Sequence, residues 1–266
     1  MKWFFNLMIG ALLFFPEKDF YALPRDFGLF EQEIFLTTRD GVRLHGWFFE
    51  APTNVGATRR VAPTLLFFHG NAGNISGRLS KIKGWFDQGF SVFLVDYRSY
   101  GKSGGKIKKG ADLLEDAEAA LRWLEEERKT PSERIVLYGE SLGSYAAIHL
   151  AGKKKFAGLV LEAPFTSLLE LARKHYGAWI PEMMLQDFPL KNEDKIREVK
   201  APVFVLHGDQ DEICPVEMGG RLYGLAPAPK EYYVVQGGRH NDLPEVAGNA
   251  YVTNPIQFIL RENGLV

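Results

Sequence analysis

A serine flanked by glycines is the residue of this chain best suited to do chemistry. Gly139-Glu140-Ser141-Leu142-Gly143 fits the pattern G-x-S-x-G, which forms a tight turn between a strand and a helix and exposes the serine hydroxyl. Small flanking residues relieve crowding in such a turn, and the N-terminus of the following helix favours negative charge. The pentapeptide alone would also suit a turn with a capping serine. The argument for Ser141 therefore depends on its partners.

A serine hydroxyl is a poor nucleophile until a base takes its proton. His240 follows the last predicted strand, and Gly237 and Gly238 just before it permit a sharp loop that returns the imidazole toward the serine. Other histidines compete less well, because they lie in predicted strands or helices or precede glycines at strand ends, where they are expected to hold loops: His45, His69, His149, His175 and His207. We predict His240 as the general base.

The base needs a carboxylate that fixes its tautomer. Asp211 follows the predicted strand that ends at residue 206, and the order Ser141, Asp211, His240 is one of the known chain orders of serine triads, Ser…Asp…His. Asp209 is the nearest competitor, for which capping of the loop is the preferred interpretation. Glu162, after another predicted strand, is a weaker alternative.

A tetrahedral intermediate carries an oxyanion that needs backbone N–H donors. One donor is expected from Leu142, directly after the nucleophile. The second is expected from the loop 69–74, His-Gly-Asn-Ala-Gly-Asn, whose small residues let its backbone approach a substrate. We assign this second donor to Asn71. No Gly-Lys-Ser/Thr ending follows this loop, which disfavours a phosphate-binding role.

The elements that must position these residues alternate between strands and helices. Residues 33–38 and 43–49 flank Asp40-Gly41, which predicts a β-hairpin that adds an antiparallel edge to the sheet. Further strands are predicted at residues 63–68, 91–95, 134–138, 157–161, 203–206 and 231–235. Helical periodicity predicts helices at residues 78–87, 111–127, 142–151 and 246–261, the last interrupted near Pro255. Such alternation predicts an α/β fold with a mostly parallel sheet covered on both faces, and sites at the carboxyl ends of its strands.

The set of motifs resembles the α/β-hydrolase superfamily, in particular a branch of serine esterases, thioesterases and relatives described as peptidases. The matching motifs are His69–Asn74, Asp96–Ser103, Gly139–Gly143, His207–Asp211 and Gly237–Asp242. The resemblance covers roughly residues 30–262 and implies an eight-stranded sheet with a small cap, here at residues 165–200. An apolar cap would bind an acyl chain, although ordinary helix–sheet packing also explains its aromatic residues. Ser99 and Ser144 depart from the branch, which often has glycine at both positions.

Composition narrows the classes of function. The formal net charge is −1, whereas a nucleic-acid binder is expected to carry positive charge. A single cysteine, Cys214, excludes an intramolecular disulfide. No cluster has the spacing of a zinc site, and the chemistry requires no cofactor.

The N-terminus differs in composition from the rest of the chain. Residues 3–15 are apolar except at Asn6, and Pro16 and charged residues follow. A bilayer span needs about 20 apolar residues, and a cleavage site of small residues is missing. We expect residues 1–16 to be a membrane-associated segment and residues 17–266 to be the hydrolase domain. A helix packed on the body or a processed signal remains open, as does a cytoplasmic or periplasmic location.

The expected function is hydrolysis of carboxylic esters through an acyl-enzyme, with no nucleic acid as partner. The apolar N-terminus favours acyl lipids such as monoacylglycerols or lysophospholipids. Thioesterase, peptidase and membrane acyltransferase activities use the same groups and stay as alternatives. A non-catalytic binding protein of the same fold is disfavoured by the complete triad.

Overall fold

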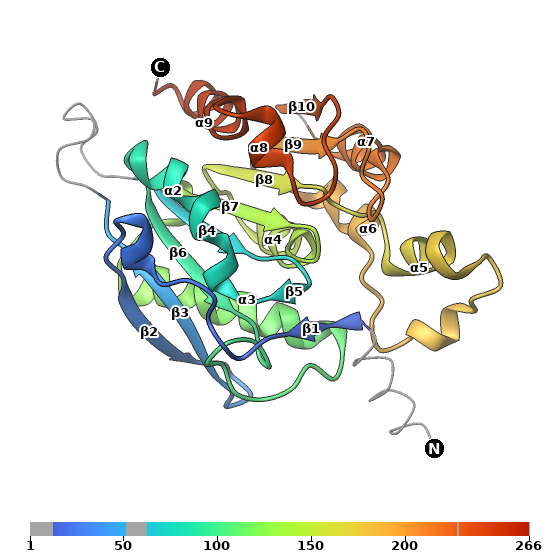
Figure 1. Cartoon of the computed structure of the whole chain (residues 1–266), viewed down its shortest axis with the longest axis horizontal. Coiled ribbons are helices and arrows are strands. Elements are labelled where there is room, and N and C mark those ends of the chain that lie inside the picture. Colours follow the sequence, from blue (N-terminus) through green and yellow to red (C-terminus); the bar gives the residue numbers. More distant parts are fainter. Residues whose placement is uncertain (1–12, 52–62, 228, 266) are drawn as a thin grey trace.

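A mixed sheet forms the centre of the molecule (Figure 1). The computed structural model describes residues 13–51, 63–227 and 229–265. Within these ranges the sheet has eight strands in the order β10-β9-β8-β7-β4-β6-β3-β2. Their bounds are β2 Gln32–Thr37, β3 Arg43–Phe49, β4 Thr64–Phe68, β6 Ser91–Asp96, β7 Ile135–Glu140, β8 Gly158–Glu162, β9 Val203–Gly208 and β10 Lys230–Val235. The predicted α/β-hydrolase fold is confirmed.

The strand directions explain the sequence pattern. All pairs from β6 through β10 are parallel, whereas β3 is antiparallel to both β2 and β6. In the central strands β4, β6, β7 and β8 every position is buried, which is why they are continuous apolar runs rather than alternating ones. The β2–β3 hairpin turns at Asp40-Gly41, where Gly41 has a φ of 82°.

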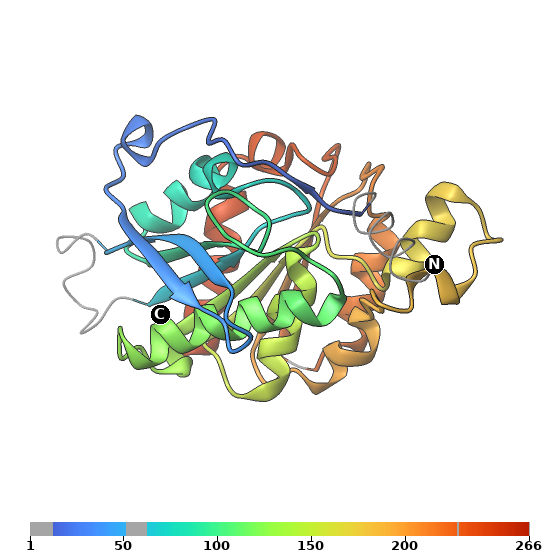
Figure 2. The same cartoon turned by 90° about the horizontal axis from the view of Figure 1, so that it is seen from below.

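Helices cover both faces of the sheet (Figure 2). One face packs against α3 (Gly110–Glu126), α4 (Gly143–Lys153) and α7 (Val216–Leu225). The other packs against α2 (Leu79–Asp87), α8 (Leu243–Ala247) and α9 (Ala250–Glu262). Each face therefore has its own apolar core, and the sheet between them is shielded from water on both sides.

The predicted C-terminal helix is interrupted at a different place. Gly248, with a φ of 55°, separates α8 from α9, and α9 continues through Pro255. The expected break near Pro255 is therefore wrong. A proline removes one backbone donor from a helix, whereas a residue with positive φ ends it, and glycine adopts that conformation at little cost.

The chain between β8 and β9 forms the region expected to be a cap. It contains α5 (Leu168–Tyr176), two 3₁₀ turns, η4 (Glu182–Leu185) and η5 (Ile196–Glu198), and the short α6 (Asn192–Lys195). Figure 1 shows α5 and the turn after it at the side of the body, beyond the carboxyl ends of the central strands. The base of this region is pinned where Ser167 pairs with Lys191 and the Leu168 N–H donates to the Leu190 carbonyl.

A short N-terminal strand lies against the body. β1 (Phe15–Pro16) pairs in parallel with β5 (Ala72–Gly73), so residues 13–16, expected to belong to a separate segment, contact the rest of the fold. Residues 1–12 of that segment lie outside the described residues. Among the residues that are described, no helix has both the length and the apolar character needed to cross a membrane.

Candidate active site

The turn that carries Ser141 joins the end of β7 to the start of α4. Ser141 has a φ of 49°, a left-handed conformation that costs an ordinary residue about 1–3 kcal/mol. A Cβ at Gly139 would come within 2.7 Å of the Gly143 carbonyl oxygen, and a Cβ at Gly143 would clash with the carbonyl of Phe68. Both glycines of the pentapeptide are therefore required by close backbone approach, as expected from the sequence.

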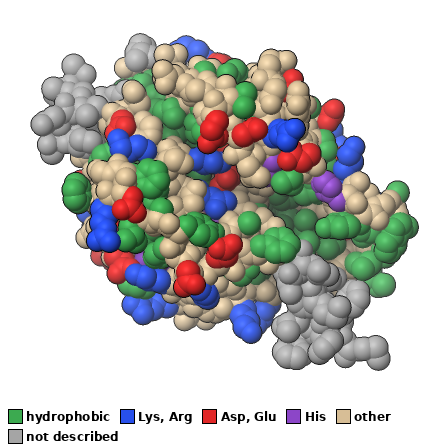
Figure 3. Space-filling view, viewed as in Figure 1, with side chains coloured by type: hydrophobic (Ala, Val, Ile, Leu, Met, Phe, Trp, Pro, Cys, Tyr) green, Lys and Arg blue, Asp and Glu red, His purple; other side chains and the backbone are tan. Residues whose placement is uncertain are grey.

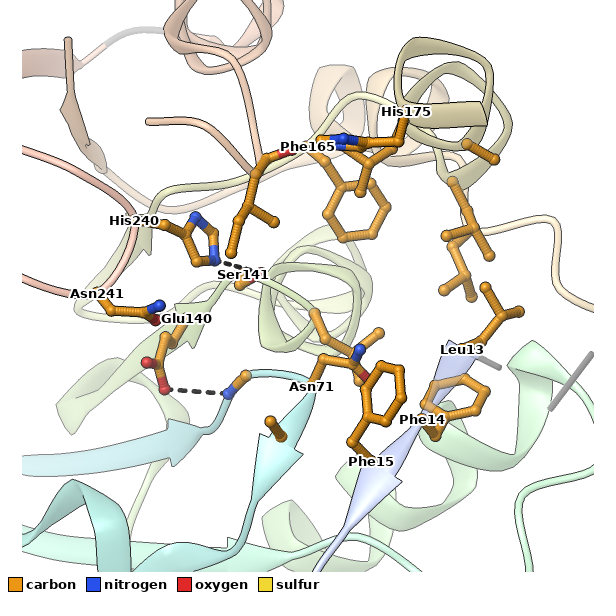
Figure 4. A pocket seen from close by; sticks show the side chains of 18 of the residues that line it. Leu13, Phe14, Phe15, Asn71, Glu140, Ser141, Phe165, His175, His240 and Asn241 are labelled. Atoms are coloured by element: carbon orange, nitrogen blue, oxygen red, sulfur yellow. Dashed lines mark hydrogen bonds between the residues drawn. The ribbon is translucent and has the colours of Figure 1, made fainter. Parts of the chain in front are cut away.

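The structure brings together the three side chains selected from the sequence. His240 Nε2 lies 3.1 Å from Ser141 Oγ, and His240 Nδ1 lies 2.7 Å from Asp211 Oδ2. Figure 4 shows the imidazole of His240 directed at Ser141 across the end of the sheet. Both distances suit hydrogen bonds, so the arrangement can pass the serine proton to the imidazole while the carboxylate holds the opposite nitrogen.

Asp211 is held as an anion by its surroundings. Its Oδ1 accepts the N–H groups of Ile213 and Cys214, at 2.9 and 2.7 Å, and its Oδ2 lies 3.2 Å from His207 Nε2. Burial by itself would raise the pKa of Asp211, but the hydrogen bonds from His207, His240 and the Cys214 amide, with the charge of His240, more than offset it, and this pKa lies below its ordinary value. The carboxylate is thus charged across the physiological range.

The two competing carboxylates are engaged elsewhere. Asp209 Oδ1 accepts the N–H of Gly237 at 2.7 Å and so connects the loop that carries Asp211 to the loop that carries His240. Glu162 accepts Lys81 Nζ at 2.7 Å, and its other oxygen accepts the hydroxyls of Tyr138 and Tyr251. In the described ranges neither carboxylate bonds to His240, which leaves Asp211 as its partner.

The two expected oxyanion donors, the N–H groups of Asn71 and Leu142, belong to residues that line the same cavity as Ser141 and His240. Within the described chain neither N–H donates to a protein acceptor. The peptide group that carries the Asn71 N–H is fixed at its other end, because the Gly70 carbonyl lies 2.7 Å from His69 Nδ1. A fixed, unpaired donor is what stabilisation of developing negative charge requires.

Comparison with known proteins identifies the family. The hydrolase family described as "Serine aminopeptidase, S33" matches residues 59–196. An uncharacterized protein of Mycobacterium tuberculosis is 37% identical over 237 residues, which cover 88% of this chain and 81% of that protein. The chain belongs to the α/β-hydrolase superfamily of serine hydrolases.

Further relatives extend the comparison. The α/β-hydrolase domain-containing protein WAV2 of Arabidopsis thaliana is 34% identical to this hydrolase over 261 residues, covering 91% of this chain and 82% of that protein. Among solved structures, the esterase Pf2001 of Pyrococcus furiosus superposes with a TM-score of 0.74 at 23% identity, covering 93% of this chain and 98% of that one. That structural likeness concerns the fold.

Ser99 and Ser144, where the resemblance led us to expect glycine, each take part in a hydrogen bond. Ser144 Oγ accepts a hydrogen bond from Asn192 Nδ2 at 2.9 Å, which links the helix after the nucleophile to the base of the cap. Ser99 has a φ of 79°, a conformation that glycine adopts more readily. Its hydroxyl accepts the Ile107 N–H at 3.3 Å.

Ser141 opens into a cavity of about 410 Å³. In Figure 4, Phe165 and His175 lie on one side of the cavity, and Phe14 and Phe15 lie on the other. The cap adds four aliphatic residues to the lining: Leu168, Leu171, Ala172 and Leu190. The site therefore offers polar groups at the nucleophile and an apolar space beside it.

Sequence reasoning missed Glu140, the residue before the nucleophile. Its Oε2 accepts the Gly70 N–H at 3.0 Å and Arg78 Nε at 2.9 Å, and its Oε1 accepts Lys81 Nζ at 2.8 Å. Burial opposes its ionisation, but Arg78 and Lys81 hold the pKa of Glu140 well below its usual range. The sequence did contain a signal for this role: a charged residue inside the tight pentapeptide turn is expected to be buried, and buried charges require partners.

Two further contributions were also missed. His207 was expected to hold a loop, and besides bonding the Cys214 carbonyl at 2.7 Å it faces the carboxylate of Asp211. Leu13, Phe14 and Phe15 line the cavity, although the sequence placed them in a separate N-terminal segment. A two-residue strand has no periodicity, so no pattern could have predicted that pairing.

Proposed function

We propose that this protein hydrolyses carboxylic esters through an acyl-enzyme on Ser141. The observation that carries the proposal is the hydrogen-bonded series Ser141–His240–Asp211, which opens into the apolar cavity. Such a series activates a serine that is otherwise a weak nucleophile.

The geometry supports a two-step reaction. Ser141 Oγ attacks the ester carbonyl while His240 Nε2 takes its proton, and the N–H groups of Asn71 and Leu142 receive the oxyanion. The protonated His240 then donates to the leaving alcohol, which departs and leaves the acyl-serine. Water, deprotonated by His240, attacks the acyl carbonyl in the same way, and the free acid is released. Asp211 stays ionised throughout and stabilises the imidazolium.

The lining of the cavity favours an acyl chain as the substrate group beside Ser141. One side of the cavity is lined by aromatic and aliphatic side chains from residues 13–15 and from the cap. Burial of apolar surface stabilises binding by about 25 cal/mol per Å². Acyl lipids such as monoacylglycerols or lysophospholipids are the proposed class.

Amide cleavage is the second candidate, because the matching family is described as a serine aminopeptidase. A free carboxylate would be the strongest acceptor for the ammonium group of an aminopeptidase substrate. Glu140 is the one carboxylate among the described residues that line the cavity, and Arg78, Lys81 and the Gly70 N–H occupy it. Because Glu140 already has these partners, we favour an ester over a peptide as the substrate.

Membrane association belongs to the same proposal. The N-terminal segment, apolar at residues 3–12 except for Asn6, leads directly to Leu13, which lines the cavity. Nearby, the cap exposes Tyr176, Trp179 and Met183, each with at least 70% of its surface accessible. Figure 3 shows hydrophobic side chains gathered over the cap next to the hollow of the site.

The first test is labelling with a fluorophosphonate, followed by a panel of substrates. We expect label on Ser141 and the highest kcat/KM for esters of intermediate or long acyl chains. Matched thioesters and aminoacyl amides are included in the panel. Preference for the amides would support the peptidase, and transfer of the acyl group to an added alcohol in place of water would support the acyltransferase.

The second test concerns the membrane. Full-length protein should float with phosphatidylcholine–phosphatidylglycerol vesicles, and a variant lacking residues 1–12 should not, while it retains turnover of a short soluble ester. The deletion stops at residue 12 because Leu13–Pro16 belong to the cavity and to β1. Full-length protein that stays with the soluble fraction would contradict the association.

A further inference from the structure

The N-terminal strand runs along the loop that supplies the second oxyanion donor. β1 pairs in parallel with β5, directly after Asn71. The Phe15 N–H donates to the Asn71 carbonyl at 3.3 Å, and the Glu17 N–H donates to the Gly73 carbonyl at 3.0 Å. The last residues of the apolar segment thus bond to the backbone of the oxyanion loop.

The Asn71 carbonyl has a second donor inside the protein. Tyr100 Oη donates to it at 2.6 Å. The preceding peptide group is held at the Gly70 carbonyl by His69, so the peptide groups on both sides of the Asn71 Cα are fixed. A donor that is fixed before the reaction needs no reorganisation when charge develops.

β1 is itself anchored on both sides of the pairing. On the N-terminal side, Phe14 is buried and its ring packs against Phe188 at 5.4 Å between centroids. On the C-terminal side, the Glu17 carbonyl accepts the Gly101 N–H at 2.9 Å and Asn74 Nδ2 at 3.1 Å. These contacts let the strand act as a fixed support.

The side chains of the same residues face the substrate space. Leu13, Phe14 and Phe15 line the cavity across from Phe165 (Figure 4). One short stretch of chain therefore contacts both the oxyanion loop, through its backbone, and the proposed acyl chain, through its side chains.

We propose that residues 13–17 are a positioning element of this active site: their backbone holds the Asn71 loop in its oxyanion-binding conformation, and their side chains form one wall for the acyl group. This inference rests on the proposed serine hydrolysis. It assigns to the end of the N-terminal segment an effect on the rate of the chemical step, in addition to an effect on substrate binding.

The experiment distinguishes the contribution of the Phe15 backbone N–H from that of the Phe15 side chain. Phe15→Pro removes the N–H that bonds Asn71, whereas Phe15→Ala keeps that N–H and removes the ring. We expect Phe15→Pro to lower kcat on an acetyl ester by about tenfold, a fraction of the 10²–10³ that follows loss of a whole oxyanion donor. Phe15→Ala should mainly raise KM for long acyl esters.

A transition-state analogue gives the decisive readout. The affinity of a short trifluoromethyl ketone, which forms an oxyanion on the serine, should fall in parallel with kcat for Phe15→Pro and change little for Phe15→Ala. Tyr100→Phe, which removes the other donor to the same carbonyl, should reduce this affinity in the same direction. Equal affinities in Phe15→Pro, Phe15→Ala and the unchanged protein would overturn the proposal.

Two further measurements keep the outcome interpretable. Thermal unfolding checks that Phe15→Pro folds, and where it does not, Glu17→Pro tests the same pairing through the bond to Gly73. The rate of fluorophosphonate labelling at Ser141 reports the oxyanion site without any assumption about the substrate. A protein that labels normally but cleaves no ester would refute the proposed substrate, whereas unchanged labelling in both proline variants would refute the role of β1.

Discussion

The two walls of the active-site cavity are held in different ways. The catalytic wall carries Ser141, Asp211 and His240, and hydrogen bonds to Asp211 and His240 fix the positions of its polar groups. On the apolar wall, formed by β1 and α5, side chains pack against one another, and exposed aromatics such as Tyr176 lie at its rim. Hydrogen bonds fix geometry within tenths of an ångström, whereas apolar contacts tolerate changes of shape.

This difference predicts two kinds of mutational effect. Changes in the catalytic wall should lower kcat for every ester by a similar factor, because the same atoms act on every carbonyl. Changes in the apolar wall should have effects that grow with acyl chain length. A large, chain-length-independent loss from an α5 variant would break the distinction.

The largest expected effect is that of Ser141→Ala. Loss of the nucleophile should lower kcat by about 10⁶-fold, since triad members act as a unit, and fluorophosphonate labelling should disappear. The removed atom is small, so thermal unfolding should be close to that of the unchanged protein. Ordinary turnover in this variant, measured with an acetyl ester, would disprove the assignment.

Asp211→Asn should come next. Asparagine favours the wrong tautomer of His240, and the equivalent change in a well-studied triad lowers kcat by about 10⁴-fold. Asp209→Asn is the matched control, because Asp209 bonds the backbone of Gly237 and not the imidazole. The reverse ranking of the two variants in a side-by-side kinetic comparison would reassign the acid.

Glu140→Gln tests the support beneath the oxyanion loop. It weakens the acceptor for the Gly70 N–H and leaves Arg78 and Lys81 with one carboxylate fewer. We expect kcat to fall by about tenfold for all chain lengths, by partial loss of oxyanion stabilisation. Glu162→Gln is the control, since it removes charge from the same network through Lys81 without contacting Gly70. Similar kinetics for both variants would show that only the charge balance matters.

Leu171→Ala tests the apolar wall. Leu171 lines the catalytic cavity, whereas Leu169 on the same helix does not. Truncation removes contact with the proposed acyl chain, so KM for an octanoyl ester should rise several-fold, in keeping with about 0.8 kcal/mol per buried methylene. Leu169→Ala should change the octanoyl-to-acetyl ratio of kcat/KM much less, and equal ratios in the two variants would place the acyl chain elsewhere.

The smallest expected effect is on stability as a function of pH. Because the pKa of Asp211 is lower in the folded state than its ordinary value, its ionised form stabilises the fold, and this contribution is complete above the unfolded pKa of about 3.9. It is lost as the pH falls from there through the folded pKa. The difference in Tm between the unchanged protein and Asp211→Asn should therefore be constant from pH 8 to 5 and shrink below about pH 4. A difference that already shrinks near pH 6 would contradict the lowered pKa.

Motifs made the catalytic wall predictable. The strands β7 and β9 are buried and mostly apolar, and β10, which is half-buried, is followed by Gly237 and Gly238. Because parallel strands place their carboxyl ends at one edge of the sheet, the loops after these strands could be expected to bring Ser141, Asp211 and His240 together. The apolar wall was not predictable in the same way. The pairing of β1 with β5 is a long-range contact between two-residue strands. The helix break at Gly248 depends on a positive φ at that glycine, whereas the sequence suggested Pro255 as the place of the break.

The position of Phe15 also determines how the molecule would sit on a surface. An extended chain reaches at most about 3.5 Å per residue, so residue 12 and the cavity wall at Phe15 are separated by only about 10 Å of chain. If residues 1–12 hold the protein on a bilayer, the tether has almost no slack. The cavity would then stay close to the lipid, and the search for a lipid substrate would be reduced from three dimensions to diffusion within a plane.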